Sequence, residues 1–384
     1  MGLANVVAAG KPAARPEESG FDLDSALDEI LAGLGPGETD ADGAELDDDG
    51  NAEGLEREVA LLAEVPQDAL VCEGMAAAAM ALEDYPSAIR HCRQLIAMKP
   101  DHYEAWFNLA VAHHRRKNFD EAEPAYEQAF RLRPDDARAL LNLGLVRELR
   151  TDNYGAREAY QGALALDPVN DRALWNLGLL SERLEAWDDA EALFQRLVET
   201  GFDNEDVWFR LGTARYQRED WPGAAQAFER SLELRPDWKE AELNRGLAML
   251  RLGRLLEAGE AFQRIYTREP DCREAIVGLT TVALETGAWE KALVLRRKLA
   301  AAGESLPDVT YNLGVVLERQ GRMEDALRFY CEALKERPRF PEALLNLGHV
   351  LDRMGRRKEA TECWKRALGL DATLAGTYFG GGSK

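Results

Sequence analysis

A period of 34 residues runs through most of this 384-residue chain and restricts its fold more than any other feature. Nine consecutive segments, spanning residues 69–374, carry the same pattern with no insertion or deletion. They begin at Ala69, Tyr103, Ala137, Asp171, Glu205, Lys239, Arg273, Pro307 and Pro341. Such a period is typical of arrays in which each unit packs mainly against its neighbours. We number the positions of each repeat as slots 1 to 34.

Four slots give the repeat its structure. Slot 20 is Ala in all nine repeats, and slot 8 holds Ala, Gly or, once, Thr, so two helix backbones can approach closely. Slot 24 is mostly aromatic, and Pro closes six of the nine repeats, where it cannot extend the preceding helix. A short polar break, such as "RQGRME" at 319–324, separates slots 8 and 20. We therefore predict two antiparallel helices joined by a tight turn in each repeat. Neighbouring repeats must stack, because one repeat cannot bury its own faces.

This pattern resembles the tetratricopeptide repeat family, whose unit has the same length and carries W-x-x-L-G, then Ala, an aromatic residue, Ala and Pro. Repeat two matches it best, at Trp106, Leu109, Ala110, Ala122, Tyr126, Ala129 and Pro134. The resemblance implies an all-α fold, a right-handed α-solenoid of nine helix-turn-helix repeats. Two positions depart from it: Arg245 occupies the Leu slot of repeat six, and Arg296 the aromatic slot of repeat seven. We expect both side chains to extend their charged heads to water; otherwise repeats six and seven form a softer joint.

The N-terminal part of the chain has a different composition. Residues 1–68 hold 18 acidic and 3 basic residues. The stretch 36–54 has almost no apolar side chains, so we predict a disordered acidic tail over residues 1–52. Inside it, residues 21–35 place Leu and Ile side chains on one helical face, which predicts either a docking helix or a transient helix without a partner. We expect residues 53–66 to form a helix that caps the first repeat, and residues 375–384 to form a short C-terminal tail.

Asn recurs at slot 6, which the family resemblance places on the concave groove of a stacked array. The six residues are Asn108, Asn142, Asn176, Asn244, Asn312 and Asn346. An amide offers a donor and an acceptor, which match the N–H and C=O groups of an extended peptide. The row is similar to the asparagine ladder in the repeat arm of O-linked N-acetylglucosamine transferases, which holds peptide main chain. We therefore predict a peptide-binding groove; the alternative is that each Asn bonds its own neighbours.

Apolar and basic side chains flank the Asn row. Slots 5 and 9 form an apolar stripe, which we expect to be a partner site unless superhelical packing closes it. Its aromatic members at slot 5 are Phe107, Trp175, Phe209 and Tyr311. The basic candidates on the same face are Arg115, Arg138, Arg172, Arg183 and Arg210. They either take an acidic ligand, such as the chain's own tail, or form ordinary surface ion pairs. The Lys and Asn of the carboxylate clamp in chaperone-binding members of the family are absent from slots 5 and 9.

The sequence disfavours several classes of function. The net charge of -22 argues against nucleic acid, whose binding needs clustered Lys and Arg, and no apolar run is long enough to cross a bilayer. We find no catalytic motif, and the five His residues do not converge on a metal site, so we expect neither an enzyme nor a cofactor. Five irregularly spaced cysteines and the lack of a secretory signal indicate the cytoplasm.

The sequence thus predicts a non-catalytic adaptor or scaffold that holds extended segments of partner proteins. One alternative is a structural, self-assembling array. In that case Trp364 and Leu368 lie at an exposed end of repeat nine and pair weakly with a second copy, because a terminal repeat needs a polar outer face. Another alternative is the recognition arm of an enzyme on another chain.

Overall fold

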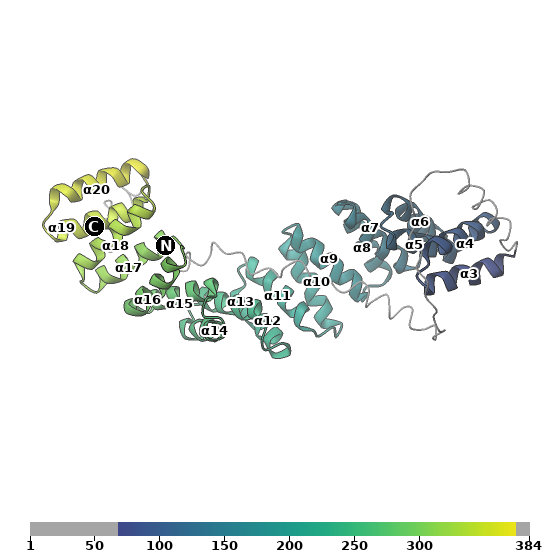
Figure 1. The fold of residues 1–384 in the computed structure, drawn as a ribbon, viewed down its shortest axis with the longest axis horizontal. Coiled ribbons are helices and arrows are strands. Elements are labelled where there is room, and N and C mark those ends of the chain that lie inside the picture. Colours follow the sequence, from purple (N-terminus) through teal and green to yellow (C-terminus); the bar gives the residue numbers. More distant parts are fainter. Residues whose placement is uncertain (1–67, 374–384) are drawn as a thin grey trace. The chain divides into compact units, whose positions relative to one another are not determined.

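The computed structural model describes residues 68–373, which form 18 α-helices and contain no β-strand (Figure 1). The predicted tail, capping helix and C-terminal tail, at 1–52, 53–66 and 375–384, lie outside the described residues. Within the described part, no helix is long and apolar enough to cross a membrane. The predicted all-α array of nine helix pairs is confirmed.

Each repeat supplies two consecutive helices. The first helices are α3 Ala69–Ala81, α5 Tyr103–Arg115, α7 Ala137–Leu149, α9 Asp171–Arg183, α11 Glu205–Gln217, α13 Lys239–Arg251, α15 Arg273–Glu285, α17 Pro307–Arg319 and α19 Pro341–Arg353. The second helices are α4 Tyr85–Met98, α6 Phe119–Leu132, α8 Asn153–Leu166, α10 Trp187–Glu199, α12 Trp221–Leu234, α14 Leu255–Arg268, α16 Trp289–Ala301, α18 Met323–Glu336 and α20 Arg357–Leu370. Every first helix begins at slot 1 and every second helix at slot 17, so the sequence period is also the structural period.

The described residues divide into two compact units, 68–202 and 203–373. In the unit 68–202, each helix from α3 to α10 packs against the next one along the chain. The same holds from α11 to α20 in the unit 203–373. Within each unit, therefore, a second helix lies between its own first helix and the first helix of the following repeat.

A left-handed residue at slot 15 makes the turn inside each repeat. Four of the nine are glycines, with φ between 72° and 78°, at Gly253, Gly287, Gly321 and Gly355. The other five are Glu83, Lys117, Thr151, Glu185 and Glu219, with φ between 56° and 63°. This conformation suits Gly best, so five repeats hold a side chain in it in order to reverse the chain sharply. The residue after it then caps the second helix in several repeats; Asp152, for example, accepts a hydrogen bond from the N–H of Gly155 at 3.0 Å.

Packing between the two helices of a repeat explains the small residue at slot 8. A Cβ added to Gly178 would lie 2.7 Å from Cε1 of Phe194, and one added to Gly314 would lie 2.7 Å from Cε1 of Tyr330. The ring at slot 24 thus fills the space beside slot 8. The Ala side chains at slot 20 are fully buried in all nine repeats, which leaves the two helix backbones close together.

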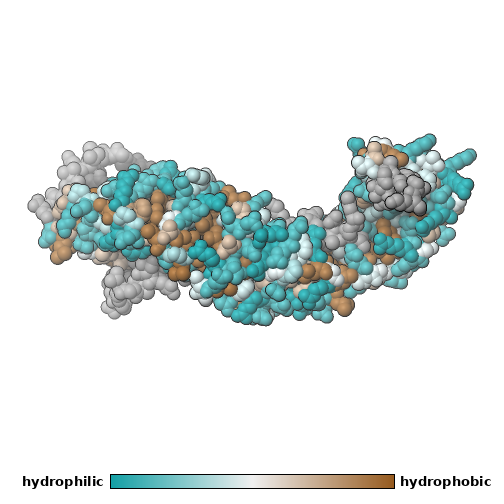
Figure 2. Space-filling model, turned by 180° about the vertical axis from the view of Figure 1, so that it is seen from behind, coloured by the Kyte–Doolittle hydropathy of each residue, from teal (hydrophilic) through white to brown (hydrophobic). Residues whose placement is uncertain are grey.

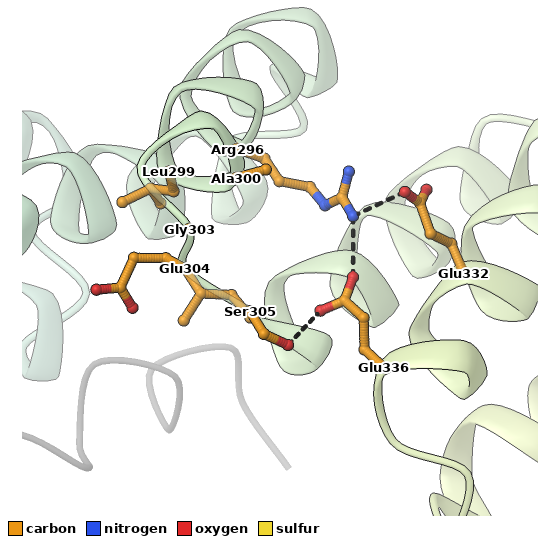
Figure 3. A pocket seen from close by; sticks show the side chains of 9 residues that line it. Arg296, Leu299, Ala300, Gly303, Glu304, Ser305, Glu332 and Glu336 are labelled. Atoms are coloured by element: carbon orange, nitrogen blue, oxygen red, sulfur yellow. Dashed lines mark hydrogen bonds and ion pairs between the residues drawn. The ribbon is translucent and has the colours of Figure 1, made fainter.

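The expectation that Arg245 and Arg296 extend to water is wrong. The side chain of Arg245 is 13% exposed and pairs with Glu229 and Glu242 at 3.5 and 3.6 Å. The side chain of Arg296 is 12% exposed, and its Nη2 lies 3.0 Å from a carboxylate oxygen of each of two glutamates in α18 (Figure 3). A charge that has lost water needs a charged or hydrogen-bonding partner. The ion pairs of Arg296 therefore link repeat seven to repeat eight.

Trp364 is half-buried and packs against the core of repeat nine, so it is less exposed than expected. Its Nε1 donates to the carbonyl oxygen of Leu345 at 3.3 Å, and a Cβ added to Gly348 would lie 2.4 Å from that nitrogen. Leu368 is half-buried, and Leu370 is exposed. Pairing with a second copy through Trp364 and Leu368 stays a prediction.

Candidate peptide-binding face

The predicted binding face consists of the side chains at slots 2, 5, 6, 9, 12 and 13 of the first helices, and we call it the first-helix face. In the unit 68–202 it carries Asn108, Asn142 and Asn176, all half-buried, on α5, α7 and α9. Nδ2 of Asn142 donates to the backbone oxygen of Arg138, one turn earlier in α7, at 3.0 Å. The amides of Asn108 and Asn176 make no hydrogen bond to any residue among 68–373. The alternative in which each Asn bonds its own neighbours thus holds for Asn142 and not for the other two.

The Asn row is incomplete in the unit 203–373. Slot 6 holds Arg210 in repeat five and glycine in repeat seven. Asn244 is fully buried, so its predicted place on an open face is wrong. Nδ2 of Asn346 donates to the hydroxyl of Tyr311 at 2.9 Å. Asn312 is half-buried and has no hydrogen bond within the described part of the chain. The uninterrupted run of three Asn residues therefore lies in repeats two to four.

The apolar stripe is largely closed at slot 5. Trp175 and Phe209 are buried, whereas Phe107 and Tyr311 are half-buried. Each of these four rings packs against the slot-24 ring of its own repeat, with ring centroids 5.8 to 5.9 Å apart. The expectation of an exposed stripe is wrong at slot 5, because six of the eight apolar side chains at this slot in repeats two to nine are buried.

Slot 9 remains accessible along repeats two to four. Val111, Leu145 and Leu179 are half-buried there. Each lies three residues after the slot-6 Asn of the same helix, so the two side chains are neighbours on one helical face. In repeat seven the corresponding Thr281 is buried, and its Oγ1 donates to the backbone oxygen of Val277. An amide and an apolar side chain thus recur together on the first-helix face of the unit 68–202.

Arg138 and Arg183, two of the basic candidates, make ion pairs with other residues in the described part of the chain. Nε and Nη2 of Arg138 lie 3.0 and 2.6 Å from the two carboxylate oxygens of Asp136, which also accepts a hydrogen bond from the hydroxyl of Tyr103 at 2.8 Å. Burial alone would raise the pKa of Asp136, but the hydrogen bonds from Arg138 and Tyr103 lower it to about 2. Nη2 of Arg183 donates to Glu148 at 2.8 Å. The alternative of ordinary ion pairs therefore describes Arg138 and Arg183.

The other three basic candidates, Arg115, Arg172 and Arg210, are half-buried. Arg115 and Arg172 lie on α5 and α9 in the unit 68–202, and Arg210 lies on α11 in the unit 203–373. Guanidinium groups bind carboxylates well when both planar groups meet. These positions stay candidates for an acidic ligand.

A pairing between slots 12 and 24 was missed by the sequence reasoning. The pairs are Tyr126 with His114, Tyr160 with Glu148 and Tyr330 with Glu318, and the phenol oxygen lies 3.4, 2.8 and 2.8 Å from its partner atom. A buried phenol needs a hydrogen-bond partner. The three repeats with Tyr at slot 24 all have His or Glu at slot 12, so the sequence alone could have indicated this pairing. These slot-12 side chains are engaged in joining the two helices of their repeat.

A cavity of about 300 Å³ lies in the unit 203–373, between α16, the loop that follows it and α18 (Figure 3). Its wall carries the ion pairs of Arg296 with Glu332 and Glu336. Ser305 Oγ donates to Glu336 at 3.0 Å. Arg296, Glu336 and Ser305 thus bond one another, which gives the wall a structural role. Among residues 68–373 there is no group of three or more His, Cys, Asp or Glu side chains suited to hold a metal ion.

Family comparison gives matches along most of the chain. Three models described as tetratricopeptide repeat match residues 79–143, then 150–204, 209–275 and 281–341, and finally 341–374. A search of curated proteins gives no match to this chain.

Several solved structures are similar to this chain. The MamA protein is 19% identical, with 43% of this chain and 90% of that chain covered and a TM-score of 0.41. A tetratricopeptide repeat protein from Parabacteroides merdae ATCC 43184 is 17% identical, with coverage of 69% and 98% and a TM-score of 0.43. YrrB, described as a TPR protein with an unusual peptide-binding site, is 22% identical, with coverage of 57% and 96% and a TM-score of 0.36. At these identities the likeness concerns the fold alone.

Proposed function

Since the chain belongs to the tetratricopeptide repeat family, we propose that it is a non-catalytic scaffold that binds extended segments of partner proteins on the first-helix face of repeats two to four. One observation carries the proposal. The amides of Asn108 and Asn176 are half-buried at the same slot of α5 and α9, and they make no hydrogen bond within residues 68–373. A partly buried amide without a protein partner is ready to bond a ligand.

The chemistry of these side chains favours peptide main chain. Each amide has both a donor and an acceptor, so it pairs with a backbone N–H or C=O whatever the side chain of the peptide. Each such bond contributes about 0.5–1.5 kcal/mol. Asn142 donates one N–H to the backbone oxygen of Arg138, which leaves its second N–H and Oδ1 for a ligand. The half-buried Val111, Leu145 and Leu179 add apolar contacts beside the amides, which favours apolar side chains at intervals along the bound segment.

A peptide array provides the test, because the partner is unidentified. The full chain is screened against peptides of about twelve residues, which span about 40 Å when extended, and the best binder is measured by calorimetry. Asn108→Ala together with Asn176→Ala should weaken its binding about tenfold or more, because two hydrogen bonds are lost. N-methylation of the backbone amides of the peptide should have a similar effect. An array with no binder, or equal affinities for parent and double variant, would contradict the proposal.

Asn312→Ala is the matched control. Asn312 occupies the same slot, is half-buried and lies in the unit 203–373. Its neighbours at slot 6 are glycine in repeat seven and Asn346, whose Nδ2 already bonds Tyr311. The control should therefore bind the peptide as the parent does. If it weakens binding as much as the double variant, the site is not confined to repeats two to four.

The alternatives have weaker support. An end-to-end array was expected to use Trp364, which packs inside its own repeat through Nε1 and Gly348. A recognition arm for an enzyme on another chain uses the same peptide-binding face, so it is a special case of the proposed scaffold. The cytoplasmic location stays a prediction.

A further inference from the structure

Helix α3 presents a broad apolar face to solvent within the described part of the chain. Its sequence, ALVCEGMAAAAMA, has one charged residue, Glu73. Cys72, Ala76 and Ala79 are buried on one side. On the other side Val71 and Met75 are exposed, and so is Leu70, of which 73% is accessible. On the face that Figure 2 shows, hydrophilic residues predominate and apolar residues gather in patches between them. A helix that is apolar all round is normally buried, so the bare side of α3 needs a cover.

The same slots are covered in the later repeats. Val71, Met75 and Ala78 are slots 3, 7 and 10 of repeat one, and all three are exposed. In repeats two to nine these slots are buried, apart from the half-buried Arg245 and Val282. Within each unit the second helix of the preceding repeat packs on that side, as α4 does on α5 and α6 on α7. The exposed side of α3 is therefore the side where a preceding second helix belongs.

Slot 27 of a second helix makes this contact with slot 3 of the next first helix. Leu95 of α4 lies in one apolar cluster with Ala105 of α5. Ala129 of α6 lies in one cluster with Ala139 of α7. A second helix that covers α3 in the same way would place an apolar slot-27 side chain against Val71.

The segment just before α3 continues the 34-residue register. Pro66 stands 34 residues before Pro100, which is a repeat-closing Pro, so residues 51–64 correspond to slots 17–30 of a second helix. In this register Leu55, Leu61 and Leu62 take slots 21, 27 and 28. Gly54 takes slot 20, where all nine repeats have Ala. The apolar and small positions thus agree with those of a second helix.

We propose that residues 51–64 form an unpaired second helix that covers the exposed side of α3, with Leu61 against Val71. The departure at slot 24 supports this half-repeat. Slot 24 holds Glu58 instead of an aromatic ring, and a ring there serves to fill the space beside slot 8 of its own first helix. The residues in the place of such a first helix, 35–50, are largely acidic or glycine, so the side chain at slot 24 faces water. The short link to Ala69 makes this segment the nearest occupant, because closing a short loop costs little entropy.

The experiment measures the accessibility of α3 in the full chain. Met75→Cys places a thiol at slot 7, and its alkylation by iodoacetamide is followed by peptide mass spectrometry, which separates it from the five native cysteines. Adding Leu61→Glu should speed the alkylation about tenfold or more, because exposure of the thiol requires opening of the covering helix. Glu58→Gln is the matched control in the same segment and should leave the rate unchanged. Hydrogen exchange of residues 69–82 in chains that keep Met75 gives a second measurement, which should also quicken with Leu61→Glu.

Three results would overturn the proposal. Alkylation of the thiol at position 75 as fast as that of a free thiol, in the chain that keeps Leu61, would mean that this side of α3 is bare. Protection of the thiol that disappears on dilution, together with a dimer in sedimentation, would mean that a second copy covers α3. Unchanged alkylation and exchange in the Leu61→Glu chain would show that this segment does not lie on α3.

Discussion

Replacing His113 by Leu should stabilise the chain, although it removes a polar group from a helix pair. His113 occupies slot 11 of α5 and is 4% exposed. Neither ring nitrogen has a hydrogen-bond partner within residues 68–373. The same slot holds buried leucines in the last two repeats, Leu317 and Leu351. A leucine therefore suits the environment that the repeat provides at this slot.

The magnitude follows from the unsatisfied ring. Leaving a buried donor or acceptor unpaired costs about 1–3 kcal/mol, whereas an apolar swap of similar volume usually costs less than about 1.5 kcal/mol. We therefore expect His113→Leu to raise the free energy of unfolding by about 1–2 kcal/mol. The matched control is Leu317→His in repeat eight, which should lower it by at least about 2 kcal/mol because it creates the same defect.

The pH dependence gives a second readout. Burial, with help from Arg93, lowers the pKa of His113 below its ordinary value of 6.5. Burial lowers the pKa of the adjacent His114 to about 4. Both groups bind a proton more readily in the unfolded chain, so stability is full above pH 6.5 and falls as the pH drops through that value. For His114 the loss approaches about 3 kcal/mol at pH 4. His113→Leu should remove the loss of stability at low pH that His113 causes and leave the loss that His114 causes.

Hydrogen exchange of α5 at neutral pH and at pH 5 is the suitable assay, because repeat arrays often unfold in parts and not in one step. The variant should exchange more slowly than the parent at both values, with the larger difference at pH 5. Faster exchange of α5 in the variant at neutral pH would refute the reasoning, since it would mean that the imidazole contributes a stabilising contact.

Three further predictions concern other parts of the chain. Tyr160→Phe should lower the free energy of unfolding by about 1–2 kcal/mol in denaturant titrations, because the bond to the Glu148 carboxylate is lost. Three other repeats have Phe at this slot, so the ring itself still fits. Equal stability would show that water replaces the phenol. Deleting residues 1–52 should raise the affinity for an acidic peptide in calorimetry, more at low salt, because the acidic tail no longer competes for the arginines of the first-helix face; no change would leave the tail without a role there. Leu368→Glu should abolish concentration-dependent pairing in sedimentation, and a parent that is monomeric throughout the micromolar range would contradict pairing through repeat nine.

The period determines what each slot contributes to its own repeat, and this part of the structure was predictable. Helix starts, the break between helices and the fit of slot 24 beside slot 8 recur because the two helices of every repeat meet in the same way. Contacts that join one slot of a repeat to a different slot of the next repeat cannot be found by aligning the repeats, because the alignment compares each slot only with the same slot elsewhere. Arg296 looked like a lone departure because its partner Glu336 stands 40 residues later, on the second helix of the next repeat.

Phe209 shows the same limit at the candidate site. It shares slot 5 with Phe107, but it is buried whereas Phe107 is half-buried. The ring of Trp238, at slot 34 of the same repeat, stacks on Phe209 with centroids 4.4 Å apart. In repeat two the residue at slot 34 is Asp136, which bonds Arg138, and the guanidinium of Arg138 lies over the Phe107 ring at 5.4 Å in place of a second ring from that slot. The residue that ends a repeat does not by itself set this exposure, because Leu141 and Trp175 are buried although repeats three and four end in Asn. The open face of repeats two to four therefore depends on slots 6 and 9, where Asn and apolar side chains stay half-buried for the proposed peptide.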